Sequence, residues 1–438
     1  MRPVRFVLFP FLLLSYLHFL VTCLNVPGTR MGQTSALVGT KLYFFGGSSA
    51  TTNATLNVGL NYSNEVWYLD LSNSSLFNTA IPTWYKDAEM PIANFFDTSC
   101  VSPTNNSAIF IFGGRQLLPN SSIISYNSPV YRFDPNNNSI WSIPNITGFN
   151  STFITRNLMK AVIDNTRRVF IFGGTSFKVN NSDTSPVMHY NDMNILDLTN
   201  MTWSTLVIPQ APPYYSYAAT ILPTGLIVYI GGLDYFSDAS QVNMSEIRIF
   251  NTTSFIWSSK PVNGSSIESR IGHSAVLGQN NDIIIYGGSK YNADVGPYGP
   301  QAFPNLVVLN TNSWTWSIPD IPPTNTPQPL SFHSAALYKN YMIVAFGLVA
   351  SSSGYYNKNL YVLDTQKYVW IAINNTATTT KGSTSQKTQT NKAQGTSNSS
   401  PNNGLFIGVG VVSCIVFIGM ASFGIFLFFK GRNRNYKK

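Results

Sequence analysis

Apolar residues along the chain gather into short runs that return at a regular interval. Each run is too short for an ordinary helix and is rich in β-branched and aromatic residues, so it predicts a buried strand. Six runs end in a glycine pair or its remnant: LYFFGG (42–47), IFIFGG (109–114), VFIFGG (169–174), IVYIGG (227–232), IIIYGG (283–288) and IVAFG (343–347). The first glycines, with Phe346 in the last copy, are 67, 60, 58, 56 and 59 residues apart. A period of this size indicates a repeat architecture.

Each repeat contains three further apolar segments. One precedes the glycine-ended run, as in SALV (35–38), KAVI (160–163), SAVL (274–277) and SAAL (334–337). Another follows it and closes on a short polar residue: Asp70, Asp134, Asp197, Asn251, Asn310 or Asp364. The last begins with Trp84, Trp141, Trp203, Trp257, Trp316 or Trp370. The polar residue and the Trp are 14 residues apart in the first repeat but 6 or 7 in the others, which predicts a tight hairpin.

Four strands in sequence order predict a small antiparallel sheet in each repeat. One such sheet cannot bury both of its faces, so the repeats must pack side by side around an axis. The expected fold is therefore all-β, a six-bladed propeller over residues 24–373. The blades are expected to start near Arg30, Phe95, Arg156, Tyr215, Arg270 and Ser331. All repeats have the same phase, so no strand exchange between the first and last blades is expected.

The combined pattern resembles the kelch-repeat family over about 350 residues. The motifs that carry the resemblance are the apolar run with its glycine pair, the strand closing on Asp or Asn, and the following Trp. The architecture is similar to the central propeller of galactose oxidase. The Asn, Ser and Thr content resembles that of fungal membrane-anchored kelch proteins. The resemblance implies a propeller that serves as an interaction module.

The two ends of the chain predict a membrane-anchored protein. Residues 1–23 combine Arg2 and Arg5 with an apolar stretch, which is typical of a signal peptide, although an uncleaved anchor is the alternative. Residues 374–404 form a Ser/Thr/Asn-rich stalk with almost nothing apolar to bury, so disorder is expected. Residues 405–429 lack charge and are long enough for one transmembrane helix. The basic tail, 430–438, then belongs in the cytoplasm. The expected protein is a single-pass type I membrane protein of the plasma membrane or secretory pathway.

The excess of positive charge lies outside the repeats, in the signal, the stalk and the tail. Of 27 basic residues, ten lie in the signal, the stalk and the tail, which leaves 17 against all 18 acidic residues. The net charge of +9 therefore does not indicate a nucleic-acid partner, because the repeats carry no basic stripe.

Fifteen Asn-x-Ser/Thr sequons agree with passage through the secretory pathway. The sequons in the loops between strands, where a glycan is accommodated, are the main glycosylation candidates: Asn53, Asn61, Asn120, Asn180 and Asn243.

Copper radical oxidases similar to galactose oxidase are the main enzymatic alternative. Their chemistry needs two Tyr, two His and a Cys around copper, and outside the signal this chain has only three histidines. His273 and His333 share one repeat position with Gln33 and Tyr217, which indicates packing between blades. His189 is expected to be a solvated loop residue, and Cys100 a buried small hydrophobe. We therefore expect no catalytic residue, metal or cofactor, with an enzyme whose site is unrecognised as the alternative.

Binding is expected at loops, because loops carry most functional residues. The loops after the glycine pairs and those joining blades should share one face, and they are rich in aromatic residues that recognition surfaces favour. The candidate ligand-binding residues are Tyr235, Tyr291, Tyr298, Phe303, Tyr355 and Tyr356. The alternative is that these rings only cover their own loops. The expected partner is an extracellular protein or a cell-wall polysaccharide. A cytosolic scaffold similar to actin- or microtubule-linked kelch proteins is a weaker alternative, because the signal and the membrane segment oppose it.

Overall fold

The computed structural model describes residues 26–50, 60–72, 82–103, 107–121, 123–125, 127–153, 156–176, 187–207, 211–235, 239–292, 299–349 and 356–373. The chain divides into two compact units, Met1–Thr378 and Thr379–Lys438. The predicted signal peptide, stalk, membrane helix and tail all lie outside the described residues. Within the described part, no helix is long and apolar enough to cross a membrane.

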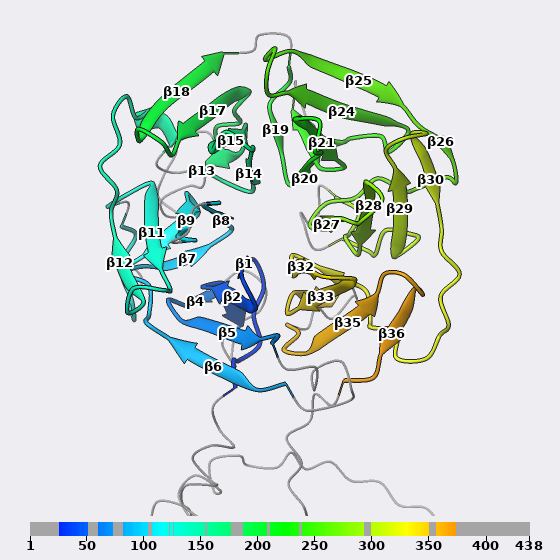
Figure 1. The fold of residues 1–438 in the computed structure, drawn as a ribbon, viewed down its shortest axis with the longest axis horizontal. Helices are drawn as coiled ribbons and strands as arrows, with labels where there is room; N and C mark the ends of the chain where they lie inside the picture. Colours follow the sequence, from blue (N-terminus) through cyan, green and yellow to red (C-terminus); the bar gives the residue numbers. More distant parts are fainter. Residues whose placement is uncertain are drawn as a thin grey trace, which may run out of the picture. The chain divides into compact units, whose positions relative to one another are not determined.

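The repeats form six sheets, one after another along the chain, and each sheet has four antiparallel strands drawn from a single repeat (Figure 1). The strands are β1 (Thr34–Val38), β2 (Lys41–Phe45), β5 (Val66–Asp70) and β6 (Trp84–Asp87) in blade 1; β8 (Thr98–Val101), β9 (Ile109–Phe112), β11 (Val130–Asp134) and β12 (Ile140–Ser142) in blade 2; β14 (Ala161–Ile163), β15 (Arg168–Phe172), β17 (Asp192–Asp197) and β18 (Thr202–Val207) in blade 3; β20 (Ala218–Ile221), β21 (Leu226–Ile230), β24 (Glu246–Asn251) and β25 (Trp257–Pro261) in blade 4; β27 (Ser274–Leu277), β28 (Asp282–Tyr286), β29 (Leu306–Asn310) and β30 (Thr315–Ser317) in blade 5; and β32 (Ser334–Tyr338), β33 (Tyr341–Ala345), β35 (Leu360–Asp364) and β36 (Val369–Ile371) in blade 6. In blade 5, β26 (Asn263–Gly264) adds a parallel strand beside β30.

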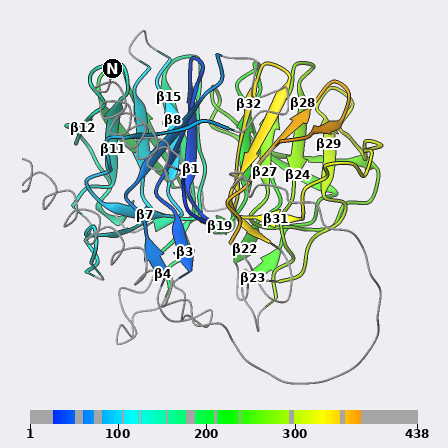
Figure 2. The ribbon, with the colours of Figure 1, turned by 90° about the horizontal axis from the view of Figure 1, so that it is seen from below.

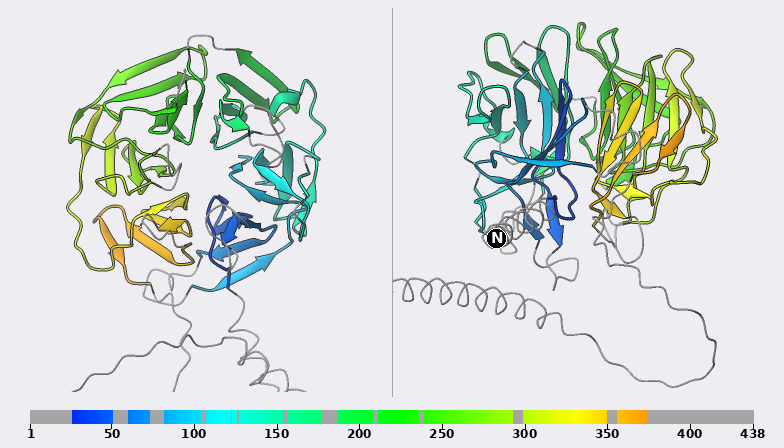
Figure 3. Two further views of the ribbon diagram at one scale, coloured as in Figure 1. Left: turned by 180° about the vertical axis from the view of Figure 1, so that it is seen from behind. Right: turned by 60° about the horizontal axis from the view of Figure 1, so that its bottom comes forward.

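The innermost strands contact one another in a closed circle. β1 contacts β8, and the contacts continue through β14, β20 and β27 to β32, which contacts β1 again. Figure 1 and the reverse view in Figure 3 show these strands nearest the axis and the Trp-led strands at the periphery. The fold is all-β with propeller architecture, and the described sheets contain no exchanged strand, as the common phase of the repeats predicted.

Short extra sheets occupy one end of the ring (Figure 2). Four of them pair the residues that start a blade with those that follow its glycine pair, and the one in blade 1 pairs two segments that both follow its glycine pair. The sequence did not predict any of them. They are β3 (Ser48–Ala50) with β4 (Leu60–Tyr62), β7 (Ala93–Phe95) with β10 (Arg115–Leu117), β13 (Arg156–Asn157) with β16 (Thr175–Ser176), β19 (Tyr214–Tyr215) with β22 (Leu233–Tyr235) and β23 (Ala239–Gln241), and β31 (Leu330–Ser331) with β34 (Leu348–Val349). We call this end the loop face.

The glycine pairs join neighbouring blades. The second glycine of each pair donates its amide N–H to a carbonyl at the start of the next blade, at 2.7 to 2.9 Å, as Gly288 does to Leu330. Both glycines have positive φ, 71° and 97° in blade 5, which side-chain-bearing residues resist. A Cβ on Gly287 would lie 2.2 Å from the Leu330 carbonyl oxygen. Glycine is therefore required by the contact between blades as well as by the turn.

The core lies between blades. Each recurring Trp packs toward the preceding blade, so that Trp257 lies 4.6 Å from Phe172 and Trp370 lies 5.1 Å from Tyr286, measured between ring centroids. At the junction of blades 1 and 6, Trp84 lies 5.5 Å from Phe346. The predicted packing role of these tryptophans is confirmed.

The residues that close the third strand hold the next hairpin. The Asp197 carboxylate accepts the Thr199 N–H at 2.8 Å, and Asp70, Asp364, Asn251 and Asn310 accept in the same way. Asp134 departs from the prediction, because its carboxylate pairs with Arg132 at 3.0 Å.

Candidate functional site

Six residues encircle the axis just before the inner strands, one from each blade. All have φ between 53° and 64°: Gly32, Phe96, Leu158, Ser216, Gly272 and Phe332. Backbone hydrogen bonds link neighbours, for example from Phe96 N to Gly32 O and from Gly32 N to Phe332 O, both 2.9 Å. We call these six residues the axial ring. The ring continues across the junction of blades 1 and 6, and it separates an aromatic surface from a polar pocket.

The aromatic surface lies on the loop face. Phe96, Leu158 and Phe332 of the axial ring form one hydrophobic cluster with side chains from the blade starts and from the loops after the glycine pairs. We call its aromatic loop and blade-start members the tyrosine face: Tyr62, Tyr215, Tyr235, Tyr291 and Tyr356. All of these except Tyr215 are half-buried, so part of each ring reaches solvent. The prediction that both kinds of loop share one face is confirmed by this cluster.

His189 belongs to the same surface, and the prediction that it is a solvated, solitary loop residue is wrong. Its ring stacks on Tyr235, with centroids 4.1 Å apart, and on Tyr215, with centroids 4.9 Å apart. Desolvation lowers the pKa of His189, which favours the neutral imidazole. Burial, together with the nearby hydroxyls of Tyr291 and Tyr235, raises the pKa of Tyr215, so its hydroxyl stays protonated.

The candidate ligand-binding residues are brought together only in part. Tyr235, Tyr291 and Tyr356 pack against the shared cluster, whereas the Phe303 side chain is 58% exposed and does not belong to it. Tyr298 and Tyr355 lie outside the described residues. A role in binding stays a prediction for all six.

The sequon asparagines that the structure describes are accessible. Asn61 in β4, Asn120 in a turn after β10, and Asn243 between β23 and β24 are all exposed. Asn53 and Asn180 lie outside the described residues. Glycosylation at these positions stays a prediction.

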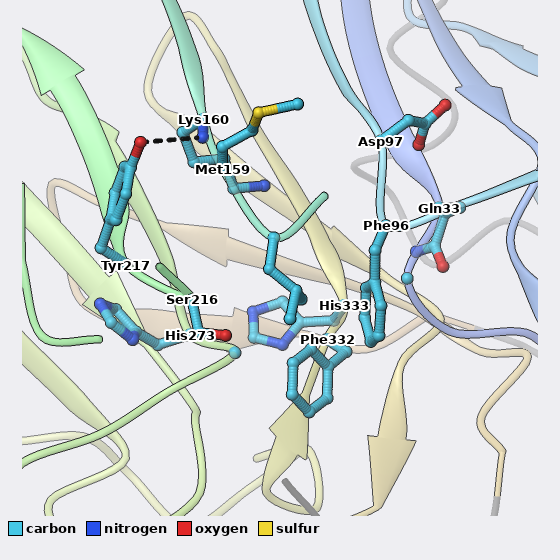
Figure 4. Close-up of a pocket in the computed structure, with 13 residues that line it drawn as sticks. Gln33, Phe96, Asp97, Met159, Lys160, Ser216, Tyr217, His273, Phe332 and His333 are labelled. Carbon is cyan, nitrogen blue, oxygen red and sulfur yellow. Dashed lines mark hydrogen bonds between the residues drawn. The ribbon is translucent and has the colours of Figure 1, made fainter. Parts of the chain in front are cut away.

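On the other side of the axial ring lies a small pocket, which we call the axial pocket (Figure 4). Its volume is about 50 Å³, enough for roughly three or four water molecules. Besides residues of the axial ring, it is lined by Gln33, Asp97, Met159, Lys160, Tyr217, His273 and His333.

Most of these side chains come from one repeat position and also separate neighbouring blades. His273 shows the geometry: a Cβ on Gly231 would lie 2.6 Å from its Cε1, and a Cβ on Gly288 would lie 3.0 Å from its Cβ. Gln33 donates from Nε2 to Ser334 Oγ at 2.8 Å across the junction of blades 1 and 6. The Tyr217 hydroxyl donates to the Phe172 carbonyl at 2.6 Å. The predicted packing role of this repeat position is confirmed, and Asp97 and Met159 also belong to it.

Burial controls ionisation in the axial pocket. Desolvation lowers the pKa of His333 to about 3 and that of His273 well below its usual value, so both rings are neutral near pH 7. Desolvation raises the pKa of Asp97 to about 8, and the charge of Lys160 only partly opposes this shift. The residue is 5% exposed, and a hydrogen bond from its own backbone N–H offsets only part of the desolvation.

Lys160 is the residue of this pocket that sequence reasoning passed over. Lys160 is an exposed residue, yet the surrounding protein desolvates its ammonium group and lowers its pKa. The signal was present in the repeats: the equivalent positions hold Thr34, Thr98, Ala218, Ser274 and Ser334. Lys160 therefore puts a charged side chain at a repeat position that holds a small residue in the other five blades.

Among the described residues, no three His, Cys, Asp or Glu side chains are placed to hold a metal ion. His273 and His333 lie between blades, and His189 lies on the opposite side of the axial ring. Cys100 is a free thiol, 7% exposed, and desolvation raises its pKa, in agreement with its predicted role as a buried hydrophobe.

The match to a known family agrees with the repeats in the sequence and with the four-stranded sheets of the structure. The KLHDC2/KLHL20/DRC7 Kelch-repeats domain matches residues 32–264 and 234–394. The chain belongs to the kelch-repeat family. Kelch domain-containing protein 3 of Bos taurus is 24% identical over 300 residues, which cover 66% of this chain and 69% of that protein. Kelch domain-containing protein 1 of Mus musculus is 27% identical over 186 residues, 41% of this chain and 42% of the relative.

In a further relative, the matching region is less than half of the protein. Acyl-CoA-binding domain-containing protein 5 of Arabidopsis thaliana is 25% identical over 349 residues, which cover 77% of this chain but only 46% of that protein. The shared kelch-repeat region therefore occurs within a longer chain. The similarity to galactose oxidase stays a prediction.

Proposed function

We propose that this kelch protein is a cell-surface interaction module that binds a partner protein through the tyrosine face. In this proposal residues 24–373 lie outside the cell or in the lumen, and residues 405–429 anchor the chain below a disordered stalk, 374–404. The sequence of the two ends and the sequons support the topology. Membership of the kelch-repeat family supports an interaction role.

The observation that carries the proposal is the gathering of half-buried tyrosines from several blades on one surface. Tyr62, Tyr235, Tyr291 and Tyr356 come from blades 1, 4, 5 and 6 and share one apolar cluster. Tyrosine offers a rigid apolar ring and a hydroxyl that hydrogen-bonds, which is why it is enriched at interfaces.

Charged pairs accompany the aromatic cluster. Arg248 lies 2.7 Å from Asp234, and Lys290 lies 2.7 Å from Glu268, both beside loop-face strands or loops. An apolar aromatic centre with a polar rim is the usual anatomy of a protein interface. A polysaccharide partner is the alternative outcome of the same binding test.

Substitution of the aromatic residues tests the binding role. We expect Tyr235→Ala, Tyr291→Ala and Tyr356→Ala each to weaken binding of surface proteins to cells that display the full chain, by about tenfold or more if the residue is a hot spot. Tyr85→Ala is the matched control, because Tyr85 is exposed on β6, a peripheral strand. Equal loss in the control, or unchanged binding in all three variants, would place the interface elsewhere.

Topology has its own test. On intact cells, an added protease should cleave an epitope inserted after Gly39, in the hairpin between β1 and β2, and leave a tag after Lys438 protected. The reverse pattern of protection contradicts the proposed orientation, whatever the partner.

A further inference from the structure

In blades 3 and 5, the linker that enters the blade pairs with the outermost strand. The Thr147 carbonyl accepts from the Trp203 N–H at 2.8 Å, and the Thr147 N–H donates to the Met201 carbonyl at 3.1 Å, which makes a parallel bridge to β18. In blade 5, β26 runs parallel to β30 in the same way. The outer edge of each of these two blades is therefore covered by a fifth segment of the chain.

The two linkers share a chemical pattern at this position. Gly148 and Gly264 both have positive φ, 73° and 93°. A Cβ on Gly148 would lie 2.7 Å from the Trp203 carbonyl oxygen, and one on Gly264 would lie closer still to the Trp316 carbonyl oxygen. Phe149, directly after Gly148, covers Trp203, with ring centroids 5.0 Å apart. Glycine thus allows the close approach of the two backbones, and the aromatic residue after it packs on the tryptophan.

Blade 4 lacks such a segment. The linker that enters it, 208–213, contains three prolines and no glycine, and proline has no N–H to donate to a neighbouring strand. Among the described residues, the peripheral strand β25 pairs with β24 alone (Figure 1). The Ile256 carbonyl accepts from the Asn251 N–H inside the sheet, so the N–H and C=O groups of Trp257 and Ser259 point outward. An unpaired strand edge of this kind is a template for another chain.

A groove follows this edge. Its volume is about 570 Å³, within the range of ligand sites, and it is lined by residues of β25, of the hairpin before it and of the neighbouring blade, among them Phe172, Tyr214, Ile256, Trp257 and Ser259. The Ile256 side chain is 62% exposed. No lining residue belongs to the tyrosine face, so the groove is a separate surface.

Two donors in the wall of the groove lack acceptors. Trp257 Nε1 and Arg248 Nη1 are both buried without a hydrogen-bond partner. In blade 2, the equivalent indole of Trp141 donates to the carbonyl of Ala88, in the linker that enters that blade, at 3.0 Å. A buried N–H without an acceptor costs free energy, so a segment that brings carbonyl groups to this position is favoured.

We propose that blade 4 takes its fifth segment from a partner protein, as an extended peptide that runs parallel to β25 with a glycine beside Trp257 and an aromatic residue directly after the glycine. The glycine lets the two backbones approach, and the aromatic ring enters the groove. Main-chain hydrogen bonds to Trp257 and Ser259 supply affinity and the groove supplies specificity, as is general for peptides that add to a sheet edge. The linkers of blades 3 and 5 define this chemistry.

A synthetic peptide that copies residues 143–150, IPNITGFN, is the probe, because it contains the segment that pairs with blade 3. Full-length protein in detergent should bind the fluorescently labelled peptide saturably in an anisotropy titration. The Gly148→Val version of the peptide should bind about tenfold more weakly or worse, because its side chain meets the Trp257 carbonyl. The Phe149→Ser version should also lose affinity, because no ring fills the groove.

Variants of the protein locate the bound peptide. Ser259→Pro removes one outward N–H without breaking a bond to β24, and it should weaken binding about tenfold or more, whereas Ser259→Ala keeps the N–H and should bind as the wild type does. Ile256→Glu should also weaken binding. Ile140→Glu is its control, because Ile140 directly precedes Trp141 as Ile256 precedes Trp257, is 47% exposed and lies outside the groove. Tyr291→Ala, on the tyrosine face, should leave peptide binding unchanged.

Circular dichroism establishes that each variant is folded before binding is measured. Absence of saturable binding to the wild type overturns the proposal, and so does equal binding of the Gly148→Val peptide, a comparison that needs no protein variant. Undiminished binding to folded Ser259→Pro and Ile256→Glu overturns it as well, because the peptide then lies elsewhere. Self-association of the wild type that Ser259→Pro abolishes would make a second copy of this chain the occupant and overturn the assignment to a partner protein.

Discussion

The amide N–H of Gly347 donates to the carbonyl oxygen of Arg30 at 2.8 Å, and this bond joins the last blade to the first. It is the same bond that the second glycine of every other blade makes to its neighbour. Nearby, Gln33 and Ser334 are linked side chain to side chain at 2.8 Å. Among the described residues, the ring is thus closed by the ordinary contact between blades, without an exchanged strand.

Gly347→Ala should destabilise the protein by about 2 kcal/mol or more. Its φ is 96°, and a Cβ would lie 2.7 Å from the His333 Cβ and 2.8 Å from the Ser331 carbonyl oxygen. Gly39→Ala is the matched control: φ is also positive, at 59°, but nothing lies within 4 Å of the added Cβ. Its cost should be about 1 kcal/mol. Urea denaturation measures both, and equal costs would mean that the junction tolerates the side chain.

Asp192→Asn should cost about 3 to 5 kcal/mol, because it removes the charge that compensates a buried guanidinium. Arg156 is 1% exposed and donates from both Nη atoms to the Asp192 carboxylate. Glu89→Gln is the comparison, since Glu89 pairs with Lys86 at 2.7 Å and the two side chains are 49% and 37% exposed. That change should cost about 1 kcal/mol or less. Chemical denaturation at pH 7 tests the order, and a larger cost for Glu89→Gln contradicts it.

Asp97→Asn should remove part of the pH dependence of stability. The folded-state pKa of Asp97 is raised to about 8, whereas an unfolded Asp titrates near 3.9. The unfolded chain therefore releases this proton first, and the wild type loses stability as pH rises from about 4 to about 8. The variant has no titrating group at this position. Its free energy of unfolding should therefore match that of the wild type at pH 4 and exceed it by about 2 kcal/mol or more at pH 8.

Thermal unfolding between pH 4 and pH 8.5 measures this difference. Asp320→Asn provides the control, because Asp320 is exposed and its substitution should not change the profile. If Asp97→Asn changes the unfolding temperature by the same amount at every pH, Asp97 keeps an ordinary pKa in the folded protein.

Cys100 should resist alkylation in the native state. The thiol is 7% exposed, and desolvation raises its pKa, which suppresses the reactive thiolate. Peptide mapping after iodoacetamide treatment should find this cysteine unmodified in native protein and modified in urea. Rapid labelling without denaturant would contradict the buried position.

Local pattern was enough to predict most of the strands. Val66–Asp70, Ile109–Phe112 and Leu306–Asn310 begin and end where the apolar segments do, because alternation and β-branched content are properties of neighbouring residues. Phe346, placed in register with the first glycines, indeed has a positive φ of 63° just after β33. The two-residue and three-residue strands of the loop face were not predicted, because segments of that length have no periodicity to read.

The candidate site was less accessible to sequence reasoning. His189 was expected in solvent because the tyrosines that stack on it, Tyr215 and Tyr235, are 26 and 46 residues away in the chain. Lys160 and Asp97 line the same pocket although they directly precede the inner strands of different blades. Their meeting depends on the ring, and the repeat alignment alone showed only that Lys160 differs from its counterparts.

The sequence by itself determined the number of repeats, the order of strands within each blade, and the structural roles of the recurring Asp and Trp residues, because hydrophobic periodicity and turn residues act locally. Tertiary structure decided how the circle of blades closes, which aromatic side chains gather on the loop face, and which polar groups face the axis. Those outcomes depend on contacts between residues tens to hundreds of positions apart, such as Gly347 with Arg30, and they exist only once six blades have packed around a common centre.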